Sequence, residues 1–399
     1  MRLFGNASSA LLTFILAPDS LKGALCANDA CLAMQRGVQR ALSSTHNDQF
    51  TTIPIPLADG GEGTVEAFAR GAGGSIRQAT VRGPLGDSVQ ARWLLLPDGR
   101  AVIEMAQASG LTLVPEEKRR ATLASSYGTG ELIRAALDEG CREILVGIGG
   151  SATTDGGTGA LQALGVRFLD ENATLLPPGG AALQQLSAID DSALDSRLAQ
   201  TTIRVLCDVT NSLYGESGAA RIYGPQKGAS PDEVQLLDAA LRHYAHVAST
   251  HIGRDISQTP GAGAAGGMGF GLMAFCSAQL VPGIDVVLET ADFAKKLETA
   301  DLVLTAEGAI DEQTPQGKAL AGIARAACVA SSGRGVPVVA FGGAIKLRGE
   351  ELRQMGIIAA LPLADAPMAL EYSMANAAQL LEDAVERAVS LWLCGRVSI

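Results

Sequence analysis

The chain has 399 residues, more than one hydrophobic core usually serves, so its length favours two domains. Its formal net charge of −11 argues against a nucleic-acid-binding or anionic-membrane surface, where a basic stripe would be expected. Seven scattered cysteines without a C-x-x-C pair argue against a disulfide framework or a zinc site and indicate a reducing, cytoplasmic compartment.

The N-terminal part alternates short apolar runs with helical spacing, which is typical of parallel βα units. Residues 12–17 are expected to form a buried strand, not a signal peptide, because the run is short and Pro18 follows it directly. Helical spacing covers 27–42, and a second strand is expected over 51–57. Pro54 and Pro56 favour a sheet edge for that strand. A helix should begin near Glu62.

The pattern changes near residue 75. Apolar runs at 76–82, 89–96 and 101–105 are separated by turn signals and predict an antiparallel meander. Beyond it we expect a helix near 129–137, strands at 144–148 and 205–207, and a helix over 231–249. The βα rhythm returns with strands at 302–305, 338–341 and 357–361, and 369–393 is predicted to form one closing helix.

These patterns predict an α/β fold with two domains. Residues 1–75 and 283–399 are expected to form a three-layer domain with a parallel sheet built from both chain ends. Residues 76–282 are expected to form an inserted mixed α/β domain. Ligands of parallel sheets collect beyond the carboxyl ends of the strands, so polar and glycine residues at those ends are candidates for the site.

The first predicted strand runs into Ser20 and Lys22. Lys22 could neutralise a phosphate or carboxylate as a point charge, or it could be a solvated loop lysine.

The second predicted strand runs into Asp59, Gly60, Gly61 and Glu62. Glycines let the backbone approach a ligand closely, and a helix N-terminus presents N–H groups to an anion. Asp59 could instead be only an N-cap.

The strongest local pattern is the loop 147–159, rich in glycines and hydroxyls between a strand and a helix. Gly150 and Ser151 are suited to contact phosphoryl oxygens. Asp155 could hold Mg²⁺ or accept a proton, although turn chemistry alone would also explain the loop.

Three later segments add weaker candidates. Asp208 and Asn211 follow another predicted strand, and Lys227 is a nearby cation in the sequence; each could be a surface residue. A formal G-x-G-x-x-G in 261–269 lacks the preceding strand that a dinucleotide site requires, which favours a closely packed or phosphate-holding helix start. Its candidate residues are Gly263, Gly266 and Gly267.

Glu307 and Asp311 follow a predicted strand and are candidate metal or ribose ligands, with capping or loop roles as the alternative. The segment up to Lys318 is not a Walker A sequence, because its glycine spacing is wrong. Acids, few lysines, glycine loops and no evident nucleophile together suit phosphoryl transfer, which depends on positioning and charge stabilisation.

Several segments, taken together, resemble the bacterial glycerate kinase family. The similarity runs in order from about residue 14 to the C-terminal helix. The segments that carry it are APDSLKG at 17–23, PLADGGEGT at 56–64, GPLG at 83–86, the loop 147–159, CDVTN at 207–211, GPQKG at 224–228 and residues 260–269.

The resemblance implies a kinase that uses ATP and Mg²⁺ to phosphorylate D-glycerate, usually at the 2-hydroxyl to give 2-phosphoglycerate. It also implies two α/β domains, one of them Rossmann-like, with the active site in the cleft between them. Family members usually have T-G-E-G-R in the late acidic motif, whereas this chain has T-A-E-G-A, ending at Ala309. The lost arginine could change the affinity, the rate or the exact substrate.

On this basis Lys22 and Lys227 are expected to neutralise the substrate carboxylate or the phosphoryl group. The loops 60–63, 149–157 and 261–267 are expected to donate backbone N–H groups. Asp155 or Asp208 is expected to accept the hydroxyl proton while the other helps to hold Mg²⁺. The alternatives are a kinase for a related hydroxy acid, transfer to the 3-hydroxyl, an NAD(P)-dependent dehydrogenase and a non-catalytic hydroxy-acid sensor.

Overall fold

The computed structural model describes residues 11–21, 23–43, 49–58, 60–312, 314, 319–329 and 335–396. These residues fall into two compact units. Unit 1 takes the described residues of Met1–Ala58, Glu66–Ala72 and Ile284–Ile399, and unit 2 those of Asp59–Val65 and Gly73–Gly283.

Unit 1 is built on a five-stranded parallel sheet in the order β13-β12-β11-β1-β2. Its strands are β1 (Leu12–Leu16), β2 (Phe50–Pro54), β11 (Leu302–Ile310), β12 (Val338–Ile345) and β13 (Ile357–Pro362). The N-terminal and C-terminal segments of the chain meet in this sheet, where β1 pairs with β11. The expected three-layer domain from both chain ends is confirmed, and β2 lies at the sheet edge, as its prolines predicted.

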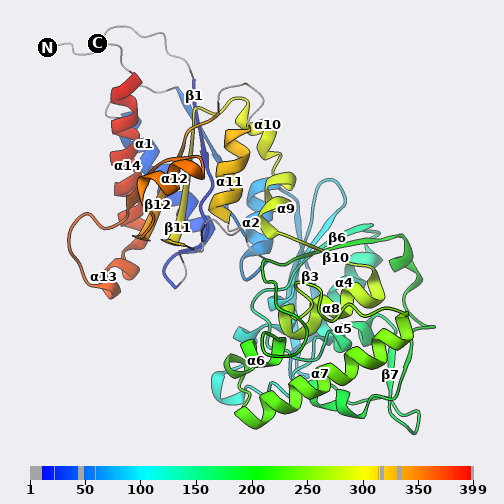
Figure 1. The fold of residues 1–399 in the computed structure, drawn as a ribbon. Coiled ribbons are helices and arrows are strands. Elements are labelled where there is room, and N and C mark those ends of the chain that lie inside the picture. The colour runs from blue at the N-terminus through cyan, green and yellow to red at the C-terminus, as the bar shows by residue number, and fades with distance from the viewer. Residues whose placement is uncertain are drawn as a thin grey trace, which may run out of the picture. The chain divides into compact units, whose positions relative to one another are not determined.

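Helices cover both faces of this sheet, with α1 and α14 on one side and α10 and α11 on the other (Figure 1). The helices that lie wholly or mostly in unit 1 are α1 (Ala27–Ser43), α2 (Thr64–Ala72), α9 (Gly283–Thr290), α10 (Phe293–Leu297), α11 (Ala319–Cys328), α12 (Gly349–Gln354), α13 (Leu370–Ala375) and α14 (Ala377–Arg396). Phe14, Leu16 and Phe341 point from the sheet into a core shared with α1 and α14.

Unit 2 is built on a six-stranded sheet in the order β10-β9-β6-β5-β4-β3. Its strands are β3 (Ser75–Arg82), β4 (Ser88–Leu95), β5 (Ala101–Glu104), β6 (Glu143–Gly147), β9 (Thr202–Leu206) and β10 (Gln279–Val281). The first three pair antiparallel, which confirms the predicted meander, and the pairs from β5 to β10 are parallel. A separate hairpin joins β7 (Arg167–Leu169) to β8 (Ala188–Asp190).

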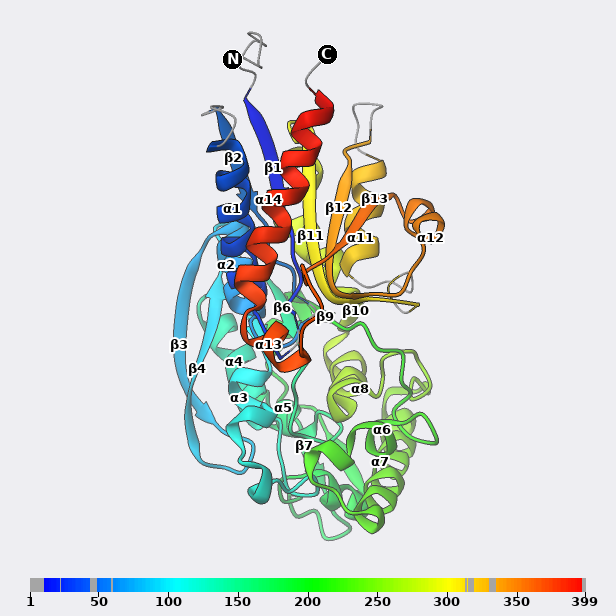
Figure 2. The same cartoon turned by 90° about the vertical axis from the view of Figure 1, so that its left-hand side faces the viewer.

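The helices of unit 2 contribute the rest of its core. Figure 2 shows these helices from a second side. They are α3 (Ala106–Ser109), α4 (Tyr127–Asp138), α5 (Thr158–Ala163), α6 (Ala219–Tyr223), α7 (Pro231–Ile252) and α8 (Ala264–Cys276), with 3₁₀ turns η1 (Leu111–Leu113), η2 (Glu116–Lys118), η3 (Gly180–Gln185), η4 (Ser196–Gln200) and η5 (Pro225–Lys227). Helix α7 begins at a capping box of Ser230 and Glu233 and ends at Gly253, which has a φ of 75°.

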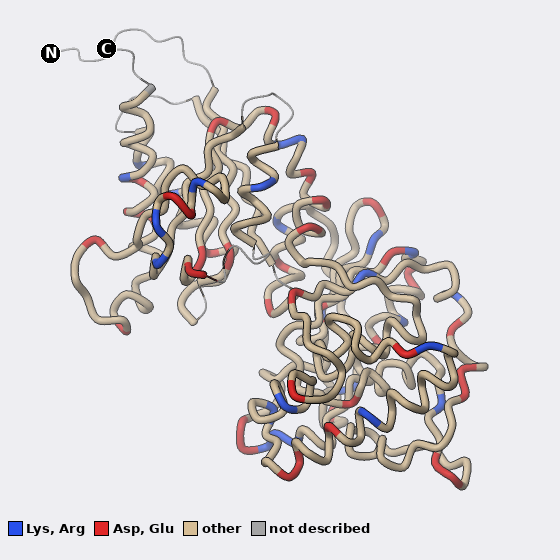
Figure 3. Tube along the Cα trace, viewed as in Figure 1, with Lys and Arg blue, Asp and Glu red and all other residues tan. Residues whose placement is uncertain are grey.

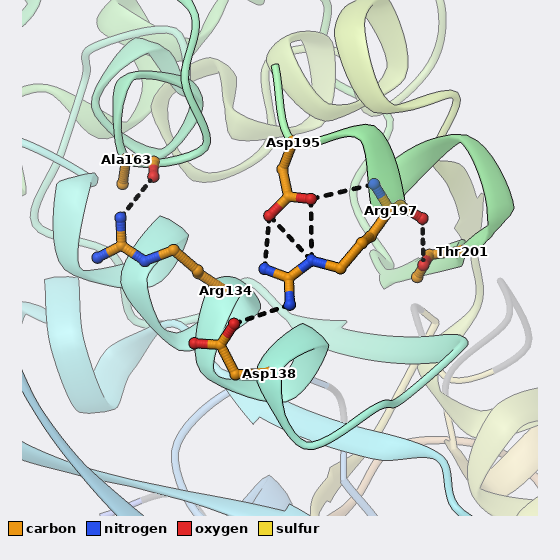
Figure 4. Close-up of polar contacts among 6 residues, drawn as sticks. All are labelled: Arg134, Asp138, Ala163, Asp195, Arg197 and Thr201. Atoms are coloured by element: carbon orange, nitrogen blue, oxygen red, sulfur yellow. Dashed lines mark hydrogen bonds and ion pairs between the residues drawn. The ribbon is translucent and has the colours of Figure 1, made fainter. Parts of the chain in front are cut away.

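A polar cluster fastens the turn before β9 to α4 and is shown in Figure 4. The Arg197 guanidinium donates to both carboxylate oxygens of Asp195 and, at 2.8 Å, to Asp138 at the end of α4. Arg134, also on α4, donates to the carbonyl oxygen of Ala163 in α5. These contacts help to fix β9, whose carboxyl end leads into the candidate site.

Charged residues of both signs alternate along the described parts of both units, without a continuous basic stripe (Figure 3). Within these parts, no helix has the length and apolarity needed to cross a membrane. None of the seven cysteines forms a disulfide.

Two predictions about the C-terminal third are wrong. The expected helix over 369–393 is interrupted at Asn376, whose side-chain amide donates to the Tyr372 carbonyl at 2.8 Å and competes there with the helical backbone N–H of Asn376. Strand β11 continues to Ile310, not 305, because its pairing with β12 extends to Ile345. Glu307 therefore lies within a strand.

Candidate active site

A cavity of about 260 Å³ lies at the carboxyl ends of β6 and β9, within unit 2. It is lined by the loops after these strands, by η5 and by the start of α8. The lining residues are Gly61, Leu111, Ile148, Gly149, Gly150, Ser151, Leu206, Cys207, Asp208, Val209, Tyr223, Gln226, Lys227, Ala264 and Ala265. Parallel strands place their carboxyl ends at one sheet edge, where ligands of α/β proteins bind, so this cavity is the candidate site.

Lys227 lines the cavity and is only 2% exposed. Its Nζ donates to Ser151 Oγ at 2.9 Å and to the Thr153 carbonyl oxygen at 2.5 Å. Burial lowers the pKa of Lys227 to about 7, and the charge of Asp155 opposes that shift. An ammonium that has lost most of its hydration attracts an anion strongly, so Lys227 is suited to bind a carboxylate or a phosphoryl group.

The loop after β6 is held in place by its own backbone. Gly149 N–H donates to the Gly60 carbonyl and Ala152 N–H to the Ser109 carbonyl, both at 2.9 Å. A Cβ on Gly149 would lie 2.6 Å from the Cα of Gly61, so this glycine allows two backbones to touch. The Gly149 N–H, which we expected to face a ligand, is therefore used inside the protein.

Asp155 is fully buried and is not among the cavity-lining residues. One carboxylate oxygen accepts from Ser126 N, Ser126 Oγ and Gly159 N, and the other accepts from Gly157 N. Burial raises the pKa of Asp155 above its ordinary value, and these four donors offset only part of that rise. Asp155, which was expected to act as a base or a metal ligand, thus forms hydrogen bonds within its own loop and to the start of α5.

A carboxylate that sequence reasoning missed holds the neighbouring loop. Glu104, at the end of β5, is 1% exposed and accepts from Gly63 N at 3.2 Å and Val65 N at 3.3 Å. It fixes the start of α2 and, through it, the loop at 60–63. Glu104 is the last residue of an apolar strand and belongs to no motif. Its position at a strand end was therefore the one feature of the sequence that could have indicated a role.

Of the candidates in that loop, Gly61 lines the cavity and Glu62 is exposed, with its side chain near the Cα of Gly150. Gly60 has a φ of 85° and packs against the β9 residue Leu206. The predicted residues Lys22 and Asp59 lie outside the described residues.

Asp208 is exposed, lines the cavity and accepts from Gly283 N at 3.0 Å. Tyr223, also in the lining, donates its hydroxyl to Asn211 Oδ1 at 2.7 Å, and Asn211 Nδ2 donates to the Ser217 carbonyl. Burial raises the pKa of Tyr223. Asn211 therefore orients Tyr223, which the sequence did not single out.

The glycines at the start of α8 serve close packing. Gly266 has a φ of 70°, and a Cβ there would overlap the Thr153 carbonyl oxygen. A Cβ on Gly263 would overlap the carbonyl of Ser212, and one on Gly267 would lie 2.7 Å from Gly156 Cα. The same turn places Ala265, with its uncommon φ of 52°, in the cavity lining.

Three further candidates, Ser20, Glu307 and Asp311, lie in unit 1, toward the carboxyl edge of its sheet. Ser20 N donates to Asp19 Oδ1 at 2.6 Å, and Asp19 N donates to Ala306 O in β11. Glu307 is 9% exposed one residue further on, and Asp311 follows the end of β11. The unit 1 candidates therefore share one sheet edge, and Gly61, Gly150, Ser151, Asp208 and Lys227 share the cavity of unit 2.

Comparison with known proteins identifies the family. The sequence profile of the glycerate kinase family matches residues 14–393. The chain belongs to the glycerate kinase family. This confirms the resemblance found in the sequence.

Individual members of the glycerate kinase family match most of the chain. A glycerate kinase of Halalkalibacterium halodurans is 45% identical over 95% of this chain and 98% of its own length. A glycerate 2-kinase of Escherichia coli is 47% identical over 79% of this chain and 82% of its own length. The crystal structure of a protein provisionally named glycerate kinase 2, from Salmonella typhimurium, is 40% identical, covers 97% of this chain and 100% of that one, and has a TM-score of 0.83.

Proposed function

We propose that this chain is a phosphotransferase that moves a phosphoryl group from ATP to the 2-hydroxyl of D-glycerate, giving 2-phosphoglycerate. Membership of the glycerate kinase family supports the reaction class and the acceptor. The name of the Escherichia coli relative, a glycerate 2-kinase, supports the 2-position.

The observation that carries the proposal is the cavity around Lys227. Glycerate and a transferring phosphoryl group are both anionic, and the cavity offers a buried ammonium beside a glycine- and serine-rich loop. In our proposal the anion forms an ion pair with the Lys227 ammonium. Gly150 and Ser151 line the other side of the anion. Asp208, exposed in the same lining, accepts a hydrogen bond from the reacting hydroxyl.

The carboxylates present also fit Mg²⁺ that is bound together with substrate phosphates. Magnesium keeps several waters and needs only one or two protein carboxylates besides the substrate phosphates. Asp208 at the cavity, or Glu307 and Asp311 at the sheet edge of unit 1, could supply such ligands. When bound, the ion neutralises charge on the phosphates.

Four expectations stay predictions: the active site in a cleft between the domains, the domain boundaries near 75 and 282, a cytoplasmic location and the absence of a nucleic-acid partner. The seven unpaired cysteines are compatible with a reducing compartment. The roles of Lys22, Asp59 and the Ala309 replacement also stay open to experiment.

Purified protein given D-glycerate and MgATP, coupled to enolase, tests the proposed function. Enolase accepts 2-phosphoglycerate and not the 3-isomer, so a signal without phosphoglycerate mutase is the expected result. A signal that needs added mutase would show transfer to the 3-hydroxyl. No signal with either coupling would overturn the proposal and make Ala309→Arg the first variant to examine.

A further inference from the structure

The carboxylate of Asp155 accepts from four hydrogen-bond donors, and three of them are backbone N–H groups. Three backbone N–H groups and the Ser126 hydroxyl point at its two oxygens, and the side chain is 0% exposed. A protonated carboxyl would need an acceptor for its own O–H, and among these four groups only the Ser126 hydroxyl, which already accepts from Ala160 N, can accept. The donors therefore favour the ionised form, whereas burial, the larger effect, raises the pKa of Asp155.

The same loop carries the two acceptors of Lys227. Ser151 Oγ and the Thr153 carbonyl oxygen, which hold the ammonium, precede Asp155 by four and two residues. The ammonium is 2% exposed, so water screens its interaction with a nearby negative charge only weakly. The charge of Asp155 acts on Lys227 in the direction that favours the ammonium form.

We propose that Asp155 is a positioning residue: its buried carboxylate binds the N–H groups of the loop that holds Lys227 and supplies the negative charge that balances the Lys227 ammonium. Its importance for catalysis rests on the proposed function, in which Lys227 binds the anionic substrate or phosphoryl group. Asp155 does not line the cavity, so it acts through Lys227 and not on the reacting hydroxyl. This assignment replaces the base or metal role expected from the sequence.

Other titratable groups surround this pair. Cys207, Asp208 and Tyr223 line the same cavity as Lys227. Arg119 packs against Gly228, the residue after Lys227, and donates to the Gln226 carbonyl. Of these groups, Asp208 and Arg119 are charged at neutral pH and have opposite signs, so the titration experiment needs a variant that removes only the charge of Asp155.

Next to Asp155 in the chain, Gly156 packs against Tyr244 of α7, a fully buried phenol. Burial and the charge of Asp155 raise the pKa of Tyr244 well above its ordinary value. Tyr244 therefore stays neutral near pH 7 and adds no charge to the pair.

The direct test is a carbon-13 NMR titration of lysine side chains. The sequence has seven lysines, which makes selective labelling practical: Lys22, Lys118, Lys227, Lys295, Lys296, Lys318 and Lys346. We expect Lys227 to titrate near pH 7 in the wild-type protein. In Asp155→Asn, which removes the charge but keeps the shape, the midpoint should fall by about one pH unit.

Asp238→Asn is the matched control, because it removes the charge of another buried carboxylate of unit 2, which accepts from Gly215 N and does not line the cavity. Its Lys227 midpoint should stay at the wild-type value. A purely structural role of Asp155 would instead give the same midpoint in wild type and Asp155→Asn, and that result would overturn the proposal.

A second measurement needs no variant to fold. The carbon-13 shift of the Asp155 carboxyl group in the wild-type protein should be that of a carboxylate at pH 7, and a protonated group there would also overturn the proposal. If the chain failed to phosphorylate glycerate, both NMR results would still decide this inference. If the chain does phosphorylate glycerate, the alkaline fall of kcat/KM should begin about one pH unit lower in Asp155→Asn than in the wild-type protein.

Discussion

Lys227 combines a charge with a position that disfavours charge. The side chain is almost fully buried, and its three possible donors find two acceptors among the described residues, Ser151 Oγ and the Thr153 carbonyl. Removing an ammonium from water is unfavourable, which is why burial lowers its pKa from 10.5 to about 7. Such a group changes charge within the physiological pH range. Its ammonium form is stabilised most when an anion enters the cavity.

We predict that kcat/KM for D-glycerate falls as pH rises through about 7, because only protonated Lys227 attracts the anion. Folding stability should change in the opposite sense. Between about pH 7 and pH 10.5 the unfolded chain still binds a proton that folded Lys227 has released, so its contribution to the free energy of unfolding rises with pH. Rates from quenched samples, with the product measured at one fixed pH, give the profile.

Lys227→Met should lower kcat/KM by about 100-fold and remove the fall. Lys295→Met, which changes an exposed lysine on α10, should keep the wild-type rate and profile. A Lys227→Met protein whose kcat/KM still falls with the wild-type midpoint would show that another group titrates.

At the residue scale, the sequence predicted which residues belong to the site better than it predicted what their side chains do. Lys227 and Asp155 were both singled out, because glycine-rich loops after strands are conspicuous. Nothing in the local pattern shows whether a carboxylate in such a loop faces a ligand or the loop's own N–H groups. Glu104 was missed for the complementary reason, since its function arises from a loop about 40 residues earlier in the chain.

At the element scale, the packing of α1 on α14 joins segments from opposite ends of the chain. Arg36 and Arg40 of α1 form ion pairs with Glu382 of α14 at 2.6 and 3.1 Å. Gly37 sits between these arginines in the sequence, and a Cβ there would lie 2.5 Å from the Glu382 carbonyl oxygen and 2.8 Å from Val385 Cβ. The glycine thus allows the helices to approach closely.

We predict that Gly37→Ala lowers the free energy of unfolding by about 2 kcal/mol, because a backbone carbonyl cannot move aside as a flexible side chain could. Gly71→Ala is the matched helical control, since a Cβ there would meet only Ala291 Cβ, at 3.9 Å. It should be neutral or slightly stabilising. Denaturant unfolding of both variants measures the difference, and equal stabilities would contradict the close-packing account.

Elements with long apolar runs were predictable, and those shaped by a single polar contact were not. Residues 12–17 and 144–148 were correctly expected to be strands because burial on both faces makes nearly every position apolar, Thr13 excepted. The break at Asn376 depends on one side chain that competes for the Tyr372 carbonyl. Strand β10 has only three residues and owes its conformation to pairing with β9.

At the scale of the whole molecule, the chain ends build one unit and the middle builds another. The return of the βα pattern near residue 300 predicted that arrangement, because parallel strands need helical connections. The pattern could not show which strands become neighbours, so the convergence of Gly61, Ser151, Asp208 and Lys227 on one cavity required the structure.

The central claim is that this cavity holds the anionic substrate beside Lys227. The most direct measurement follows the carbon-13 signal of the Lys227 side chain while D-glycerate is added, with Lys295 as an exposed reference. The account predicts a saturable shift at Lys227 and a rise in its pKa, because a bound anion favours the ammonium form. An unchanged Lys227 signal at glycerate concentrations that saturate turnover would place the substrate elsewhere and contradict it.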